Sequence, residues 1–139
     1  MELTLDRNNW GPNAWSFIHY VALGYPTNPT DNDKENYKTF YYSLQNTLPC
    51  QKCAVNYQRH LKDIPIDSAL GGPQELFKWT IDIHNEVNKE LGKRKYSYEE
   101  VSDKYKEKES ASSIPIIPSC IAIILLLIFV GIFLFNRYQ

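Results

Sequence analysis

Two cysteines three positions apart are the residues of this chain best suited to carry out chemistry. Cys50 and Cys53 enclose Gln51 and Lys52, and two thiols at this spacing can open and close a disulfide. A helix that begins at the pair would stabilise a thiolate on the first sulfur, because the N-terminal end of a helix is partly positive. Lys52 adds a nearby positive charge. The remaining cysteine, Cys120, lies in an apolar segment and is interpreted as a packed or lipidated thiol.

The cysteine pair alone leaves three kinds of site open. A zinc site needs four ligands, and beyond the pair the sequence offers His60 and His84 but no second pair. A thioredoxin-like reductase needs strands around the motif, and no period-2 pattern flanks it. The third kind is a disulfide that exchanges electrons with a bound cofactor. A flavin fits that role, because it accepts two electrons and reacts with O2.

Two further segments contain side chains that could hold such a cofactor. Trp15 and His19 are four residues apart, so they share one helix face, and His84, Asn88 and Leu91 form a similar stripe. Each of these residues taken singly is more often part of a core. The spacing also suggests aromatic residues that could stack on rings and basic residues that could meet a pyrophosphate: Trp79, Tyr96, Tyr105, and Lys93 with Arg94 and Lys95.

Hydrophobic periodicity predicts an all-α protein. No strand pattern of useful length and no internal repeat is present. We expect Asp31 or Asp33 to cap the second helix, Gly24 and Gly92 to follow helix ends, and residues 63–73 to form an irregular linker. The expected helices are four core helices and a short fifth, at 13–24, 33–48, 50–61, 74–91 and 98–106.

The C-terminal part of the chain predicts a membrane anchor. No charged residue occurs at 114–135, and a helix over 118–135 would be about 27 Å long, close to the roughly 30 Å of a bilayer core. The N-terminus lacks the apolar core of a signal peptide. We therefore expect a single-pass, tail-anchored protein whose domain faces the cytosol. The expected parts are a domain at 1–107, a linker at 108–114, a transmembrane helix at 115–135 and a tail at 136–139.

Charge and cysteine content exclude two function classes. The chain has 15 Lys and Arg against 16 Asp and Glu, a net charge of −1, so it lacks the basic signature of nucleic-acid binding. Three cysteines in 139 residues are too few for a disulfide-dense secreted scaffold.

Taken together, three motifs resemble the Erv/ALR family of FAD-linked sulfhydryl oxidases, and the resemblance covers residues 10 to about 105. The motifs are Trp-Gly-Pro-x-x-Trp-x-x-x-His at 10–19, Pro-Cys-x-x-Cys at 49–53 and His-Asn-x-Val-Asn-x-x-Leu-x-Lys at 84–93. The small size and apolar tail are most similar to members encoded by large cytoplasmic DNA viruses. The resemblance implies a four-helix bundle with a short fifth helix, bound FAD and a homodimer.

The resemblance also implies roles for individual residues. Cys50 would be the outer sulfur, attacked by a substrate thiolate, and Cys53 the sulfur beside the flavin. The implied reaction is 2 R–SH + O2 giving R–S–S–R + H2O2, with no resident metal. Contacts with FAD are implied for Gly11, Pro12, Asn13, Trp15 and His19, for His84, Asn85, Val87, Asn88 and Leu91, and for Lys93, Tyr96 and Tyr105.

One departure from the family bears on the substrate. Many relatives carry a second, distal cysteine pair that passes electrons to the inner disulfide, and this chain has none. The substrate therefore meets Cys50 directly, or a separate thioredoxin- or glutaredoxin-like dithiol carrier does so. We favour the carrier, acting in a viral cytoplasmic disulfide pathway at a host or virion membrane. The alternative function is a membrane-anchored metal-binding or adaptor helical module.

Overall fold

The computed structural model describes residues 5–112, 124–128 and 133–137 and is helical, with no strand among these residues. The all-α prediction is therefore confirmed for the described part of the chain. Its elements up to residue 112 are α1 (Arg7–Leu23), α2 (Asp31–Thr47), α3 (Gln51–Asp63), the 3-10 helix η1 (Ile66–Ala69), α4 (Pro73–Glu90) and α5 (Tyr98–Ser112).

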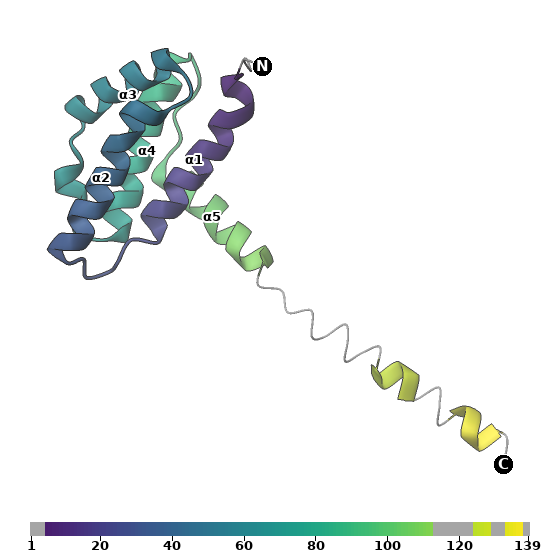
Figure 1. Ribbon diagram of the computed structural model, residues 1–139. Helices are drawn as coiled ribbons and strands as arrows, with labels where there is room; N and C mark the ends of the chain where they lie inside the picture. The colour runs from purple at the N-terminus through teal and green to yellow at the C-terminus, as the bar shows by residue number, and fades with distance from the viewer. Residues whose placement is uncertain (1–4, 113–123, 129–132, 138–139) are drawn as a thin grey trace. The chain divides into compact units, whose positions relative to one another are not determined.

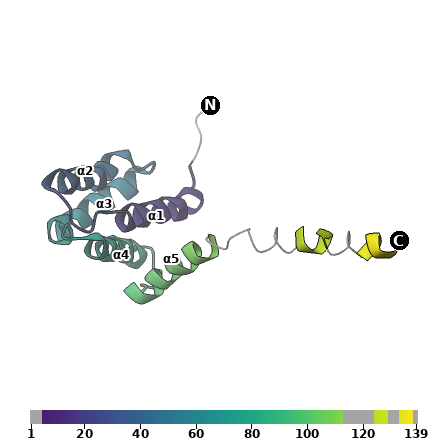
Figure 2. The ribbon, with the colours of Figure 1, turned by 90° about the horizontal axis from the view of Figure 1, so that it is seen from below.

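The first four α-helices alternate in direction along the chain. Helix α1 packs against α4, α2 packs against α3, and α3 packs against α4 (Figures 1 and 2). Because of the alternation, the start of α1, the start of α3 and the end of α4 lie at the same end of the bundle (Figure 1). This end therefore holds both the cysteine motif and the last turns of α4.

Helix α1 begins at Arg7 rather than at the predicted residue 13. The side chain of Asp6 caps it by accepting a hydrogen bond of 2.9 Å from the Asn8 N–H. Pro12 lies inside the helix, where proline normally removes a backbone bond and disfavours helical geometry in the preceding residue. That preceding residue is Gly11, whose lack of a Cβ relieves the clash. The helix therefore continues through the Gly-Pro pair.

The cap of α2 also differs from the prediction. The capping residue is Thr30, not Asp31 or Asp33. The Asp33 N–H donates to the Thr30 hydroxyl at 3.2 Å, and the Asp33 carboxylate accepts from the Thr30 N–H at 2.9 Å. Asp33 is thus the third residue of a capping box. The hydrogen bonds from Thr30 lower the pKa of the Asp33 carboxyl.

Aromatic side chains fill much of the core and connect its helices through their polar tips. Four buried rings each donate their one hydrogen bond to a backbone carbonyl, as burial favours. Burial also raises the pKa values of Tyr41 and Tyr57, which keeps both hydroxyls protonated as donors. The four bonds run from Tyr41 to Ile18 (3.1 Å), from Tyr57 to Tyr41 (3.2 Å), from Trp79 to Ile64 (2.9 Å) and from Tyr25 to Leu70 (3.1 Å).

The chain divides into two compact units, Met1–Val101 and Ser102–Gln139, so the division falls within α5. Helix α5 continues to Ser112, past the predicted end at 106 and through most of the expected linker at 108–114. The Glu and Lys residues of this segment are good helix formers. Most of the predicted linker is therefore helical, and the fifth helix is longer than predicted.

The predicted membrane span, residues 115–135, lies largely outside the described residues. Of it, the structure describes 124–128 and 133–135, which are helical. Among the residues that the structure describes, no helix has the length and apolar character needed to span a bilayer.

Candidate functional site

The cysteine pair forms a disulfide at the start of α3, as its spacing predicted. The Cα atoms of Cys50 and Cys53 are 5.1 Å apart. Cys50 is the N-cap of α3, and its Sγ accepts a hydrogen bond of 3.2 Å from the Cys53 N–H. Both residues are half-buried. The sulfur of Cys50 therefore lies in the positive field of the helix end, which favours its thiolate when the bond is reduced.

The surroundings of the pair do not match the other two readings of the motif. Within the described ranges, no group of three or more His, Cys, Asp or Glu side chains is arranged to hold a metal ion. Nor does any strand occur in these ranges to supply a thioredoxin-like context. Of the three kinds of site that the pair left open, the redox disulfide agrees best with this part of the chain.

The predicted cofactor residues of the first and fourth helices come together where α1 packs against α4. The rings of Trp15 and His84 are stacked, with centroids 4.0 Å apart and planes only 3° from parallel. His19, one turn later on α1, contacts Thr80, one turn earlier on α4. The helices are therefore antiparallel in a register that brings flat rings side by side. We call this surface the α1–α4 face; its members are Trp15, His19, His84, Val87, Asn88 and Leu91.

His19 is one of the two buried polar residues of this face, with Asn88. Its Nδ1 lies 2.8 Å from Thr80 Oγ1, and its Nε2 lies 3.1 Å from His84 Nδ1. The edge of the imidazole also meets the Phe77 ring, with centroids 5.6 Å apart. Both nitrogens are thus hydrogen-bonded, which removes most of the cost of burying the ring.

Asn88 extends the α1–α4 face toward the end of α4. It follows His84 by four residues, in one stripe with Val87 and Leu91. Asn88 is buried, yet its Nδ2 has no hydrogen-bond partner among the described residues. A buried donor without an acceptor costs about 1–3 kcal/mol. This amide therefore remains available to an acceptor from outside the described residues.

A second buried donor is also without a partner. The Nε1 of Trp10, near the start of α1, has no acceptor among the described residues. Of the neighbouring predicted residues, Gly11, Pro12 and Asn13 lie in the first turns of α1. Pro12 and Asn13 are exposed, and Asn13 Nδ2 donates to the Asn9 carbonyl at 3.2 Å.

A tight turn after α4 positions the remaining predicted residues. Gly92 has a φ of 67°, in the left-handed region, and its N–H donates to the Lys89 carbonyl at 3.1 Å. The N–H of Lys93 donates to the Asn88 carbonyl at 2.8 Å. These two bonds form a Schellman motif, which confirms that Gly92 ends the helix. The side chain of Lys93 is exposed and forms no ion pair within the described residues.

The loop after Gly92 returns along α4 and is held there by Asn85. The Asn85 Nδ2 donates to the Tyr96 carbonyl, and its Oδ1 accepts from the Tyr96 N–H, both at 2.9 Å. Lys95 pairs with Glu86 at 2.7 Å, and the Arg94 guanidinium lies 4.0 Å from the centroid of the Tyr96 ring. The Asn85 amide is thus engaged in positioning this loop.

Trp79, a predicted cofactor residue, is not part of the α1–α4 face. Trp79 is a core residue, only 4% exposed, and its ring meets Tyr41 edge-on at 5.0 Å. Tyr105 belongs to α5 in the second unit, where it is buried and the Lys108 ammonium lies 5.9 Å from its ring centroid. The structure thus brings together the residues spaced four apart, but not every aromatic residue that the sequence offered.

Helices α3 and α4 are joined by a polar cluster around Glu90. Its carboxylate pairs with Arg59 and accepts a hydrogen bond of 2.7 Å from Asn56 Nδ2. The Nε2 of buried His60 lies 3.3 Å from Glu90 Oε1, an ion-pair distance without hydrogen-bond geometry. Asn56 follows Cys53 by three residues, about one helical turn. The cluster therefore fixes α4 against α3 one turn beyond the disulfide.

Thr80 and Glu90 were not predicted as site residues, and Trp10 was predicted only as the first residue of the motif at 10–19. The position of Thr80 could have indicated a site residue, because it precedes His84 by four residues and so lies on the same face of α4. No spacing pattern indicated Glu90, because its partners come from another helix.

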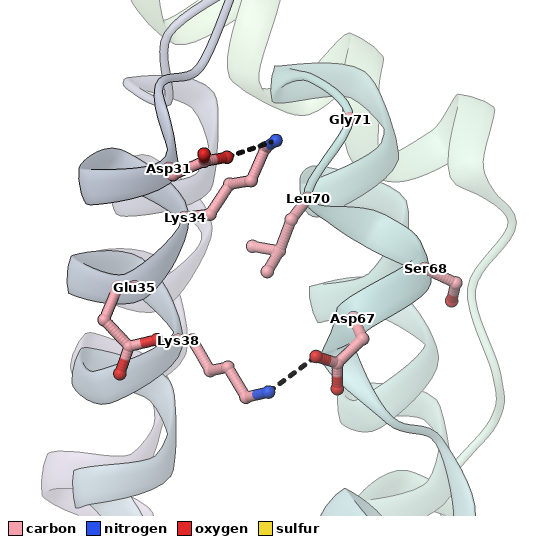
Figure 3. A pocket seen from close by; sticks show the side chains of 8 residues that line it. All are labelled: Asp31, Lys34, Glu35, Lys38, Asp67, Ser68, Leu70 and Gly71. Atoms are coloured by element: carbon pink, nitrogen blue, oxygen red, sulfur yellow. Dashed lines mark hydrogen bonds and ion pairs between the residues drawn. The ribbon is translucent and has the colours of Figure 1, made fainter.

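Two surface hollows lie near these elements. The larger, about 510 Å³, lies between α2 and the η1 region, and none of the predicted cofactor or catalytic residues lines it (Figure 3). Two ion pairs flank it, Lys34–Asp31 at 3.1 Å and Lys38–Asp67 at 2.5 Å.

The second hollow, about 490 Å³, lies between α4 and the returning loop and is lined by Asn85 and Tyr96 among others. Tyr98 donates to Asp82 at 2.7 Å there, and this bond to a carboxylate raises the pKa of Tyr98 to about 12.

Comparison with known proteins identifies relatives over most of the first unit. Residues 12–106 match the Erv1 / Alr family. A probable FAD-linked sulfhydryl oxidase of Acanthamoeba polyphaga mimivirus is 48% identical over 97 residues, which cover 69% of this chain and 68% of that protein. The mitochondrial FAD-linked sulfhydryl oxidase ERV1 of Saccharomyces cerevisiae is 32% identical over 91 residues, 66% of this chain and 47% of that protein. This chain thus spans about half of the yeast relative.

A solved structure shows the same arrangement of helices. The FAD binding domain of Erv1 from Saccharomyces cerevisiae superposes with a TM-score of 0.64 at 31% identity, covering 68% of this chain and 88% of that domain. The expected resemblance in fold is therefore confirmed for the helical bundle.

Glu90 provides a test of the polar cluster. Glu90→Ala removes the common partner of three α3 side chains and is expected to lower the free energy of unfolding by about 1–2 kcal/mol. Chemical denaturation measures the change. Glu107→Ala is the matched control, because the described part of the chain shows no ion pair for Glu107. An equal effect of the two substitutions would contradict the role of the cluster.

His60 predicts a pH dependence of stability. Burial, and then the charge of Arg59, lower the pKa of His60 below its ordinary value of 6.5. The unfolded chain therefore takes up this proton first as the pH falls. The contribution of His60 to the free energy of unfolding is fully present above about pH 6.5. Below that pH it declines, by at most about 1.4 kcal/mol per pH unit. His60→Gln should flatten this slope, whereas Arg59→Gln should retain most of it because burial is the larger cause. An unchanged slope in His60→Gln would refute the assignment.

Proposed function

Because this chain belongs to the Erv1/Alr family, we propose that it is an FAD-dependent thiol oxidase that works through the Cys50–Cys53 disulfide. One observation supports this most strongly. A disulfide at the start of α3 shares one end of the bundle with the last turns of α4, where Asn88 offers an unused buried donor.

The residues of the α1–α4 face fit FAD in shape and chemistry. Trp15 and His84 present parallel rings that match a planar ring system. The Asn88 amide donor matches a carbonyl, ring nitrogen or phosphate oxygen. Lys93, exposed beside the turn, would meet a phosphate. The remaining contacts proposed by resemblance are with Gly11, Pro12, Asn13, Asn85, Tyr96 and Tyr105, and Trp79 is proposed as a further aromatic residue that could stack on a ring.

The two cysteines have distinct roles in this proposal. A substrate thiolate attacks Cys50 Sγ, the bond between the cysteines breaks, and Cys53 leaves as a thiolate. A second substrate thiolate then attacks the mixed disulfide, forms the product disulfide and releases Cys50. The substrate loses two electrons and the pair gains them. FAD, when bound, accepts those electrons and passes them to O2, so the net reaction is 2 R–SH + O2 giving R–S–S–R + H2O2.

The substrate proposed for Cys50 is a protein dithiol. The chain has no second cysteine pair to act as an internal shuttle, since Cys120 is its only other cysteine. A small thioredoxin- or glutaredoxin-like carrier would fill that role, in a viral cytoplasmic disulfide pathway. The half-buried position of Cys50 at the helix start suits a partner that brings its own thiolate to the sulfur.

A membrane anchor and a homodimer complete the proposal. The uncharged sequence at 114–135 is long enough to span a bilayer, and it would hold the oxidase domain at a host or virion membrane, facing the cytosol. In its described part, Leu125 to Leu127 are each at least 60% exposed. The homodimer rests on the family resemblance, and Phe17, an apolar side chain exposed on α1, would suit such a contact.

Flavin content and oxygen uptake test the proposed function. The purified full chain is expected to be yellow, and to consume O2 and release H2O2 when given dithiothreitol. Cys53→Ser and Cys50→Ser should both abolish turnover. Only Cys50→Ser leaves a free thiolate next to the flavin, which should add a long-wavelength absorbance band. A folded wild-type protein that neither contains nor takes up FAD would refute the function, and equal spectra of the two variants would refute the assigned roles.

Asn88 tests the location of the cofactor separately from catalysis. Asn88→Leu keeps the side-chain volume but removes the unpartnered amide. We expect the apoprotein to be at least as stable as the wild type, while FAD affinity falls by about tenfold, the value of one buried hydrogen bond. Calorimetric titration with FAD and thermal unfolding of the apoprotein measure both. Val55→Ala, an exposed change on α3, is the control. Unchanged FAD affinity would place the cofactor elsewhere.

A further inference from the structure

We propose that the outer face of α3 is the docking surface for the substrate, a protein dithiol with acidic residues and an apolar side chain near its reactive cysteine. The residues of this face are Lys52, Val55, Arg59 and Lys62, which we call the α3 stripe. The proposal rests on the proposed function and adds to it the chemistry of the partner. The stripe begins at the redox pair, because α3 starts directly after Cys50.

The four residues of the α3 stripe lie on one side of the helix. They follow one another at intervals of three, four and three residues, which place side chains one above another. From Lys52 to Lys62 the stripe is about 15 Å long, and all four residues are exposed. On the opposite side of α3, Ala54, Tyr57 and Leu61 are buried in the core. The stripe therefore faces away from the bundle.

The charge of α3 differs from that of the helices packed against it. Helix α3 has three basic residues against one acidic residue, Asp63 at its last position, which gives a formal charge of +2. Helix α2 has two basic against three acidic residues, and α4 has two against four. A positive face beside negative neighbours attracts an acidic partner and orients it during the approach.

The basic side chains of the stripe are able to pair with a partner. Among the residues that the structure describes, neither Lys52 nor Lys62 forms an ion pair. Arg59 pairs with Glu90, yet 58% of its side chain remains exposed. A guanidinium has five N–H donors. The pair with Glu90 therefore holds Arg59 in place and leaves donors for a carboxylate of the partner.

Val55 supplies an apolar contact in the middle of the stripe. It is 54% exposed, and Lys52 and Arg59 lie about one turn away on either side of it. A β-branched residue is a weaker helix former than alanine, so helix stability does not account for valine at this position. An apolar centre with a polar, charged rim is the usual composition of a protein interface.

Docking along the stripe would bring the substrate sulfur to Cys50. The attacking group is a thiolate, and its negative charge is attracted by Lys52 and by the partly positive start of α3. The partner sulfur then bonds to Cys50 Sγ as the bond between the two cysteines breaks, and Cys53 leaves with the electron pair. Contacts at Arg59 and Lys62 would hold the partner along α3 during this step.

Oxidation of synthetic dithiol peptides by the full chain tests the proposal. Two peptides carry the same Cys-x-x-Cys pair and one leucine, and they differ in whether glutamates or lysines flank the pair. At about 0.1 M salt we expect kcat/KM to be about tenfold higher for the glutamate peptide. At about 1 M salt, where the Debye length is about 3 Å, the two values should agree within about twofold. Equal values at both salt concentrations, or a preference for the lysine peptide, would overturn the proposal.

Lys62→Glu separates docking from the chemistry of the disulfide, because residue 62 lies at the far end of the stripe. It should lower kcat/KM for the glutamate peptide by about 3- to 10-fold. Turnover of dithiothreitol, which is small and uncharged, should stay within about twofold of the wild type. Lys104→Glu makes the same change of charge at an exposed position of α5 and is the matched control. An equal effect of the two substitutions on the peptide would contradict the docking surface.

Binding of a fluorescent peptide provides a readout that needs neither flavin nor turnover. The glutamate peptide with serine in place of both cysteines cannot react, and fluorescence anisotropy measures its Kd for the full chain. Lys52→Glu should raise this Kd by about 3- to 10-fold, and Val55→Ala by about 2- to 3-fold. An unchanged Kd in both variants and in Lys62→Glu would show that the peptide does not bind the stripe.

The two levels of inference fail in distinguishable ways. If the full chain oxidises no dithiothreitol, the proposed function fails, while anisotropy still reports whether the stripe binds an acidic peptide. If it oxidises dithiothreitol without preferring the glutamate peptide, the docking surface is overturned and the function stands. Binding to anionic lipid vesicles that Lys62→Glu abolishes, without any preference between the peptides, would assign the stripe to a membrane surface and also overturn the proposal.

Discussion

The structure depends on one buried imidazole that joins α1 to α4. A polar ring inside a small core is tolerated only when both nitrogens are bonded, because an unpaired buried group costs about 1–3 kcal/mol. His19 meets this requirement with Thr80 on one side and His84 on the other. Sliding α1 along α4 by one turn would break both bonds, so the imidazole fixes the register of the two helices and the stack of Trp15 on His84.

This register connects local geometry to chemistry. It lines up ring planes along one face of the α1–α4 pair, and it leaves the Asn88 Nδ2 buried without an acceptor among the described residues. The Glu90 cluster then fixes α3 against the same stretch of α4. Because the disulfide begins α3, the cluster also limits how far the sulfurs can move from the end of α4. A redox pair that must exchange electrons with a bound group benefits from such a rigid frame.

Much of this arrangement could be predicted from the sequence, because periodicity and spacing are local signals. The disulfide, the Gly92 helix end and the shared faces of Trp15 with His19 and of His84 with Asn88 all follow from positions three or four residues apart. Helix starts were harder to predict. The first helix was predicted to begin at residue 13, whereas α1 begins six residues earlier, at Arg7.

Residues whose roles depend on packing between helices could not be predicted from spacing. Trp79 has the residue type expected in a ring-stacking site, yet it fills the core and donates to the Ile64 carbonyl. In the sequence, Glu90 looks like any exposed helical glutamate. Only the packing of α3 against α4 brings Asn56 and Arg59 to it. Asn85 matches the family motif, but its amide holds the Tyr96 backbone. In each case the decisive contact joins separate elements of the chain.

The central claim is that the Cys50–Cys53 pair delivers electrons to a flavin held by the α1–α4 face, and an anaerobic reduction tests it most directly. Dithiothreitol is added without oxygen to the FAD-containing wild type and to Cys53→Ser, and flavin absorbance is followed over time. The account predicts that the wild type bleaches and regains its colour when air is admitted, while Cys53→Ser stays oxidised over the same period. Equally fast bleaching of both proteins would contradict the account, as would a wild-type flavin that stays oxidised while the cysteine pair is reduced.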